Sequence, residues 1–118
     1  MEKVSVKVGP SVYPSTIVLV SSGTIDGEKN VATLAWAADC SAEPPMVCIA
    51  LRPSRYTHEL ISRTGEFVLN IPTADQVKKA DYCGNVSGRQ KDKFAECGFT
   101  PVPASKVKAP LIGECPVN

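Results

Sequence analysis

The fold is decided by the stretch Tyr13–Asn70, which reads YPSTIVLVSSGTIDGEKNVATLAWAADCSAEPPMVCIALRPSRYTHELISRTGEFVLN. Three apolar runs in it have the length and composition of β-strands: Thr16–Ser21, Val31–Ala38 and Met46–Leu51. The first is apolar without alternation, which predicts a strand buried on both faces. Asp26-Gly27 predicts a hairpin between the first two runs, and Pro44-Pro45 excludes a helix where the third begins.

Downstream of these strands the chain predicts a short helix and one more strand. The helix is expected to have Ser54 or Thr57 as its N-cap, to run through Arg63 and to stop at Gly65. A fourth strand is expected over Glu66–Ile71, where alternate residues are apolar.

Two further helices are expected after this strand. Thr73 and Gln76 form a capping-box pattern that opens a helix ending near Gly84. A third helix is expected over Gln90–Cys97, with Gly98 as its stop. These elements predict a single mainly β domain over residues 1–118, built as a barrel with helices packed outside it.

Composition excludes several function classes. The 118 residues allow one domain, and the 43% hydrophobic and 21% charged contents are ordinary for a globular chain. The net charge of +1 argues against a nucleic-acid partner. No apolar run approaches the roughly 20 residues of a membrane helix, and the opening MEKVSVKVGP lacks the apolar core of a signal peptide. A cytoplasmic protein without a membrane or nucleic-acid partner is therefore expected.

The cysteines do not follow the pattern of a metal site or a disulfide framework. They stand at Cys40, Cys48, Cys83, Cys97 and Cys115, without a CxxC pair. His58 is the only histidine, whereas zinc sites normally carry closely spaced Cys or His ligands, so no metal is expected. No disulfide is expected in a reducing cytoplasm. Buried packing suits most of these residues, but Cys40 leaves two roles open, electron exchange at a nearby site or passive packing.

The segment Arg52–His58, RPSRYTH, has the composition of a phosphate-binding site. Arg52 and Arg55 supply guanidinium groups, and Ser54 and Thr57 supply hydroxyls. A helix that starts here adds free backbone N–H groups and the positive end of its dipole. The residues also leave open a structural alternative, a capped helix with solvated arginines.

Two motifs in combination resemble the flavin reductase-like, or flavoredoxin, family of FMN-binding split barrels. They are PP…LRPSRYTH, from Pro44 to His58, and SGRQKDKF, from Ser87 to Phe94. The resemblance extends over about residues 12–118. It implies a mainly β, antiparallel, Greek-key-like split barrel with short flanking helices. It also implies that family strands which follow LIGECPVN are missing from this chain.

The resemblance implies an FMN site with no catalytic residue and no metal. The residues matched to this site are Asn30, Thr33, Leu34, Ala35, Trp36, Ala37, Cys40, Arg52, Ser54, Arg55, Thr57, Ser87 and Arg89. Asn30 and Thr33 suit the ribityl hydroxyls. Ala35 and Ala37 are small enough to let a flat ring approach the backbone. Trp36 either shields the ring or is a core or interface aromatic.

The implied function is that of an NAD(P)H-dependent flavin reductase-like oxidoreductase, in which the flavin supplies the redox chemistry and the protein supplies binding and orientation. Two alternatives stand beside it: a flavoredoxin-type electron carrier fed by a redox partner protein, and a non-catalytic split-barrel interaction fragment. FAD is the alternative cofactor. Family members are usually homodimers, and Trp36, Tyr82 and Phe94 are each candidates for either the interface or the core.

Overall fold

The computed structural model describes residues 1–118 and shows a mainly β chain with short helices. The strands are β1 Val18–Gly23, β2 Lys29–Leu34, β3 Ala37–Ala42, β4 Pro45–Ile49, β5 Phe67–Asn70, β6 Pro101–Val102 and β7 Leu111–Ile112. The helices are α1 Tyr56–Thr64, α2 Val77–Asn85 and α3 Lys93–Cys97, and a 3-10 turn, η1 Ala74–Gln76, precedes α2. The predicted class is confirmed.

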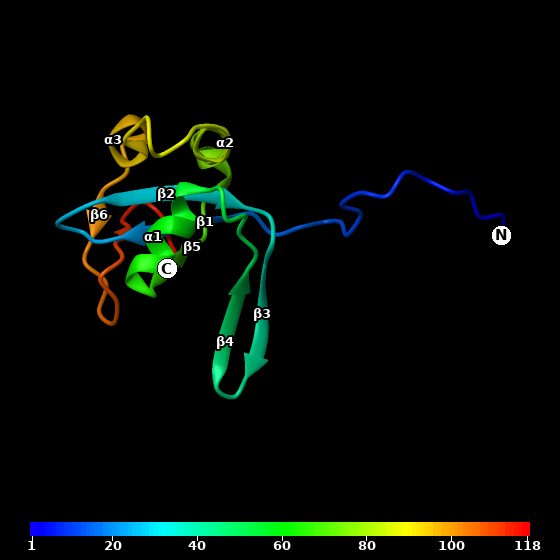
Figure 1. Cartoon of the computed structure of the whole chain (residues 1–118), viewed down its shortest axis with the longest axis horizontal. Helices are drawn as coiled ribbons and strands as arrows, with labels where there is room; N and C mark the ends of the chain where they lie inside the picture. The colour runs from blue at the N-terminus through cyan, green and yellow to red at the C-terminus, as the bar shows by residue number, and fades with distance from the viewer.

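The middle strand of the main sheet is β1. This sheet is antiparallel and has the order β2-β1-β5 (Figure 1). All six residues of β1 are buried, which confirms the strand predicted to be covered on both faces. The turn between β1 and β2 is closed by the Thr24 amide, which donates to the Glu28 carbonyl at 2.9 Å. Asp26 and Gly27 lie in this turn, as expected.

The prediction of one continuous strand over Val31–Ala38 is wrong, because these residues are divided between β2 and β3. Leu34, the last residue of β2, pairs with Val18, the first residue of β1. Beyond this pair β1 offers no further backbone partner, so the chain leaves the sheet at Ala35 and Trp36. It resumes as β3, which pairs only with β4.

The hairpin of β3 and β4 points away from the sheet and the helices, and the N-terminal segment extends away from the body (Figure 1). Pro45 opens β4, as the proline pair predicted. Most side chains of the hairpin are exposed, including those of Met46 and Val47. Its base is closed by one backbone hydrogen bond of 3.0 Å from the Ala50 amide to the Trp36 carbonyl.

The end of α1 was predicted correctly and its start was not. Gly65 ends the helix in the left-handed conformation with a φ of 72°, which residues with side chains rarely adopt. Arg55 is the N-cap and provides no side-chain cap, so the prediction of Ser54 or Thr57 as the cap is wrong. Thr57 is buried instead, and its Oγ1 accepts a hydrogen bond from Asn30.

The capping box of Thr73 and Gln76 is confirmed, and it opens η1, which leads directly into α2. The third helix starts later than the predicted Gln90. Asp92 accepts a hydrogen bond from a backbone amide of the first turn of α3 and thereby caps that helix. Gly98 ends α3, as predicted.

The core lies where the β1–β2 face of the sheet meets α2, α3 and the C-terminal segment (Figure 1). Its buried hydrophobic residues are Leu19, Val31, Ala80, Cys83, Phe94, Cys97, Phe99, Ile112 and Cys115. Phe94 is 2% exposed and is therefore a core residue rather than an interface aromatic. Asn70 ties the C-terminal segment to the sheet, because it donates to the Leu19 carbonyl and accepts from the Ile112 amide, each at 3.0 Å. None of the helices combines the length and apolar character needed to cross a membrane.

Candidate functional site

A cavity of about 340 Å³ lies between β2, the start of α1 and the segment from Cys83 to Lys93. Its size is in the range of small-molecule and cofactor sites. Three parts of the chain that are distant in sequence therefore contribute to one site. The helix α1 packs on β1 and β2 of the main sheet, and α2 packs on β2 and places the third segment beside it.

Most of the residues predicted for a cofactor site lie on this cavity. They are Asn30, Thr33, Leu34, Ala35, Trp36, Arg52, Ser54, Arg55, Thr57, Ser87 and Arg89. Ala37 and Cys40 do not line it. Both residues follow the point where the chain leaves β2 and enters the hairpin, so the division of the predicted strand carries them away from the cavity.

The charge of the lining is entirely positive. Four basic residues contribute to it, and no Asp or Glu does: the basic residues are Arg52, Arg55, Arg89 and Lys93. Arg89 is paired with Glu59 at 2.8 Å, whereas Arg52, Arg55 and Lys93 make no ion pair. A group of cations without carboxylate partners beside a helix N-terminus favours an anionic ligand.

Lys93 is the most informative of these cations because it is only 4% exposed. Its Nζ donates a hydrogen bond of 2.8 Å to the Cys83 carbonyl. Burial lowers the pKa of Lys93, and the nearby Arg55 guanidinium also lowers it, while the thiols of Cys83 and Cys97 act in the opposite direction. Burying an ammonium without a carboxylate partner is costly, so the place of Lys93 on the cavity favours an anionic ligand.

Asn30 supplies a second indication of a ligand. Its side chain is 2% exposed, and its Nδ2 donates to Thr57 Oγ1 at 2.9 Å. Its Oδ1 has no hydrogen-bond partner, although buried polar atoms are nearly always bonded. The Gly88 backbone lies directly against this amide, because a Cβ at Gly88 would overlap Oδ1. A hydroxyl donor bound in the cavity would complete the hydrogen bonding of Asn30.

Arg89 joins two walls of the cavity. Its guanidinium donates to the Ser54 carbonyl at 3.1 Å and to Glu59 at 2.8 Å, and it lies over the Tyr56 ring at 5.3 Å from the centroid. The segment that follows α2 is thereby held against the start of α1. Its charge is largely committed to these contacts, which distinguishes Arg89 from Arg52 and Arg55.

The far wall of the cavity is built from small and apolar side chains. Ala35 and Trp36 line it, and both also line a second cavity of about 590 Å³ at the base of the hairpin. Trp36 is 50% exposed and Ala35 is also exposed, so neither is a core residue. Ala37 lies on the second cavity. Thr33 already donates its hydroxyl hydrogen to the Ala80 carbonyl at 2.5 Å.

The sequence interpretation did not assign Lys93, Tyr56 or Gly88 to the site, although each lines the cavity. Lys93 and Gly88 belong to the SGRQKDKF segment, so that motif contained the signal for both. A buried lysine is not recognisable from composition, because most lysines are exposed.

The cavity offers three kinds of binding group: cations, an unpartnered amide oxygen and a wall of small and apolar side chains. The lining contains no Asp, Glu or His and therefore no carboxylate or imidazole general base. No cluster of three His, Cys, Asp or Glu side chains is arranged for a metal ion. The cationic end, the unpartnered Asn30 oxygen and the small-residue wall fit a ligand with an anionic group, a polar chain and a flat apolar part.

The family profile described as "Flavin reductase like domain" matches residues 11–118 of the chain. An uncharacterised protein of Archaeoglobus fulgidus is 38% identical over 106 residues, which cover 90% of this chain and 59% of that protein. The chain therefore spans about three-fifths of the length of that relative.

Solved structures of flavoredoxin and of a split barrel domain are also similar to this chain. The flavoredoxin of Desulfovibrio vulgaris (Miyazaki F) is 39% identical and superposes with a TM-score of 0.88, over 96% of this chain and 62% of that one. A split barrel domain from Shewanella frigidimarina is 24% identical, with a TM-score of 0.76 over 86% of this chain and 51% of that one. The predicted fold, the split barrel, is thus confirmed.

Proposed function

The chain belongs to the flavin reductase like domain family, and on this premise we propose that its cavity binds FMN in a redox-active flavoprotein. The D. vulgaris flavoredoxin at 39% identity supports a flavin as the ligand class. Bound FMN supplies the chemistry, since it accepts two electrons as hydride and passes them on. The roles left to this chain are to bind, orient and shield the cofactor.

The phosphate belongs at the cationic end of the cavity. Arg52 and Arg55 are free of ion pairs and lie next to the N-terminus of α1, whose first backbone N–H groups have no helical acceptor. Ser54 adds a hydroxyl between the two arginines. These groups together neutralise a phosphate monoester by charge-assisted hydrogen bonds.

The ribityl chain and the ring belong along β2. Asn30 Oδ1 is the acceptor for a ribityl hydroxyl, because it is buried and unpartnered. Ala35 and Trp36 form the smooth wall for the ring where β2 ends. Lys93 brings a positive charge to the cavity without a counter-ion, which favours the reduced, more electron-rich cofactor.

One observation carries this assignment: three cations without ion pairs and one buried amide oxygen without a partner lie on the same cavity. A buried polar atom without a hydrogen-bond partner costs about 1–3 kcal/mol of free energy, and a buried charge without a partner costs more. A ligand that carries both a phosphate and hydroxyls meets all of them at once.

We propose reduced nicotinamide, NADH or NADPH, as the electron donor, which would make the protein an oxidoreductase. An electron carrier that takes its electrons from a partner protein is the second candidate, and the similarity to flavoredoxin favours it. We also propose a homodimer, because the hairpin and its base carry three exposed large hydrophobic residues, Trp36, Met46 and Val47. Its mass in solution tests this last point.

An anaerobic titration of the FMN-loaded protein with NADH and then NADPH tests the proposal. Loss of the visible absorbance of oxidised flavin on addition of either nicotinamide alone supports the reductase. Retention of the colour with both nicotinamides, followed by its loss on addition of a flavoprotein reductase, supports the carrier. Failure of the purified protein to bind FMN would overturn the flavoprotein assignment itself.

A further inference from the structure

The five free cysteines fall into two groups with different surroundings. Cys83, Cys97 and Cys115 are buried, and all three belong to the core cluster. Cys40 and Cys48 are exposed and lie on the two strands of the β3–β4 hairpin. Neither exposed cysteine lines the proposed flavin cavity.

The buried pair is chemically protected. The sulfur atoms of Cys83 and Cys97 are 3.6 Å apart, on α2 and α3. Burial and the contact with Cys97 raise the pKa of the Cys83 thiol to about 12. A thiol with such a pKa is protonated at neutral pH, and the thiolate is the reactive form. This pair therefore provides an internal control for the exposed one.

The hairpin register brings Cys40 and Cys48 together on neighbouring strands. Cys48 of β4 pairs with Ala38 of β3, and Cys40 stands two residues after Ala38 on β3. Cys40 therefore lies within two residues of the position opposite Cys48 on the neighbouring strand. The register shifts between Asp39 and Ser41, which makes Cys40 the extra residue of a bulge. Desolvation and, after it, the neighbouring Cys48 thiol raise the pKa of the Cys40 thiol, so it is exposure to solutes, and not an acidic thiol, that sets this pair apart from the buried one.

We propose that Cys40 and Cys48 form a reversible dithiol–disulfide couple on the hairpin, oxidised by hydroperoxides and reduced by small thiols. One thiolate attacks the peroxide oxygen to form a sulfenic acid and releases an alcohol or water. The second thiol then displaces water from that sulfenic acid, and the S–S bond forms. The two electrons thus pass from the two sulfur atoms to the peroxide. Two external thiols reverse the reaction and are themselves joined as a disulfide.

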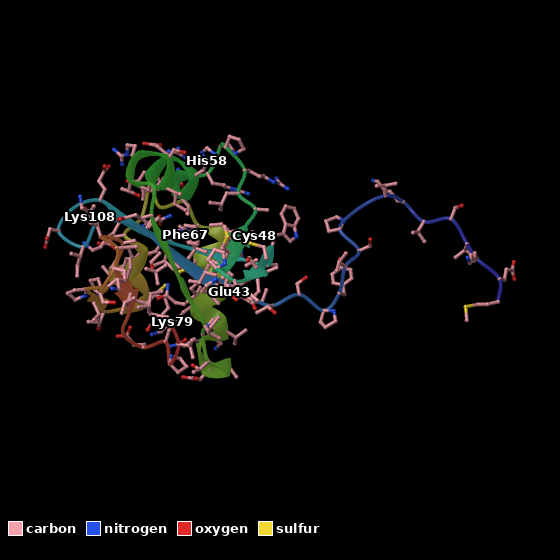
Figure 2. The ribbon with its side chains drawn as sticks, turned by 90° about the horizontal axis from the view of Figure 1, so that it is seen from below. Glu43, Cys48, His58, Phe67, Lys79 and Lys108 are labelled. Atoms are coloured by element: carbon pink, nitrogen blue, oxygen red, sulfur yellow. The ribbon has the colours of Figure 1, made fainter.

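Exposure favours reversibility. Disulfides that are exposed have higher reduction potentials than buried structural ones and are the labile or regulatory class. Both cysteines are exposed and therefore reachable by peroxides and by small thiols. In Figure 2, Cys48 lies with Glu43 on the side of the body from which the N-terminal segment departs.

The couple also lies close to residues that line the proposed flavin cavity. Cys48 lines the second cavity, at the base of the hairpin, together with Trp36 and Ala50. Trp36 and Ala50 line the proposed flavin cavity as well. Trp36 is the only tryptophan of the chain, so its fluorescence is a direct readout of a change at this base. The proposal requires no flavin and stands independently of the proposed function.

Peptide mapping of the purified protein tests the proposal. The protein is treated with hydrogen peroxide, denatured, alkylated with iodoacetamide and digested with trypsin. Both exposed cysteines fall in the peptide Asn30–Arg55, whereas Cys83 and Cys97 fall in two different peptides, Ala80–Arg89 and Phe94–Lys106. We expect the peptide Asn30–Arg55 to be unalkylated and two hydrogen atoms lighter than its reduced form. The other two peptides should be alkylated, and the fluorescence of Trp36 should be shifted in the oxidised protein. Glutathione added before alkylation should restore two alkylated cysteines and the original fluorescence.

Matched variants complete the test. Cys40→Ser and Cys48→Ser should each abolish the internal link and the fluorescence change, whereas Cys83→Ser should behave as the wild type. Four results would overturn the proposal: alkylation of both cysteines after oxidation, a sulfinic or sulfonic acid without a link, a disulfide between two copies of the chain, or failure of glutathione to restore the thiols. A link between Ala80–Arg89 and Phe94–Lys106 in place of the hairpin link would overturn it too.

Discussion

Asn30 and Thr57 are joined by a buried hydrogen bond of 2.9 Å, from the amide Nδ2 of the first to the hydroxyl Oγ1 of the second. The bond connects β2 to the first turn of α1, and it holds the Asn30 side chain with Oδ1 unpartnered. The strand and the helix, which both line the cavity, are thus held together.

Replacing Asn30 by Ala should weaken FMN binding by about 0.5–1.5 kcal/mol, or roughly 2- to 12-fold in Kd, because a ribityl hydroxyl loses its acceptor. Quenching of flavin fluorescence measures this affinity. The matched control is Ser22→Ala. Ser22 is the residue paired with Asn30 in the sheet, and its Oγ is the other unpartnered buried oxygen, but it does not line the cavity. An equal loss of affinity in both variants would contradict a contact between Asn30 and the ligand.

Replacing Arg55 by Ala should weaken FMN binding by about tenfold, or about 1.4 kcal/mol, because the phosphate loses a charge-assisted hydrogen bond. The affinity of the wild type should also fall with rising salt more steeply than that of the variant. Arg63→Ala is the control, since Arg63 is on the same helix but pairs with Glu28 outside the cavity. Isothermal titration at two salt concentrations decides the matter, and identical affinities of the Arg55 variant and the wild type would place the phosphate elsewhere.

Replacing Gly88 by Ala should disturb both the fold and the site. The new Cβ would overlap the Asn30 amide and lie 2.9 Å from Cδ1 of Tyr56, so both side chains must move. We expect a loss of about 1–3 kcal/mol in the free energy of unfolding, as for other overpacked positions, together with weaker FMN binding. Gly9→Ala, where a Cβ meets nothing within 4 Å, should change neither. Denaturant titration that shows no difference between the two variants would contradict the close contact of Gly88 with Asn30.

Replacing Ala35 by Phe should block the ring of FMN while the melting temperature of the apoprotein stays unchanged, because Ala35 is exposed on the cavity wall and not in the core. Ala38→Phe is the control, because Ala38 is likewise exposed but lines only the second cavity. Thermal unfolding and flavin binding are measured for both variants. Retention of FMN by the Ala35 variant would show that the ring lies away from the end of β2.

The alkylation of Cys40 should depend on Cys48. Partial desolvation raises the pKa of the Cys40 thiol, and the neighbouring Cys48 thiol raises it further. Because the thiolate is the nucleophile, Cys48→Ser should shift the pH profile of Cys40 alkylation to lower pH and increase the rate near pH 8. Mass spectrometry of the Cys40 peptide gives the rate at each pH. A profile that does not move would contradict a contact between the two thiols.

The local parts of this fold could be predicted from the sequence. Gly65 requires a left-handed conformation, the Thr73–Gln76 capping box depends on residues three apart, and the Asp26-Gly27 turn joins adjacent strands. Each of these signals is complete within a few residues. The end of β2 is different, because it depends on where β1 begins, some sixteen residues earlier in the pairing of Val18 with Leu34.

The site was predictable to the extent that its motifs were contiguous. Arg52, Ser54 and Arg55 stand within four residues of one another and all line the cavity. Ala37 is expected there as a small residue beside a flat ring, and Cys40 as a residue just past the predicted strand, but the break after Leu34 carries both into the hairpin. Lys93 could not be identified as buried, because its burial results from α3 packing beside the end of α2. That contact is tertiary and leaves no pattern in the sequence.

The hairpin makes the two ends of the cavity unequal in local stability. The cationic end of the cavity lies at the start of α1, which packs on β1 and β2. The opposite end, at Ala35 and Trp36, leads into a hairpin whose strands pair only with each other. Segments with few buried contacts open at a lower free energy than the core, so amide hydrogens of β3 and β4 should exchange before those of β1. A bound ligand would therefore contact packed elements at one end of the cavity and the less stable base of the hairpin at the other.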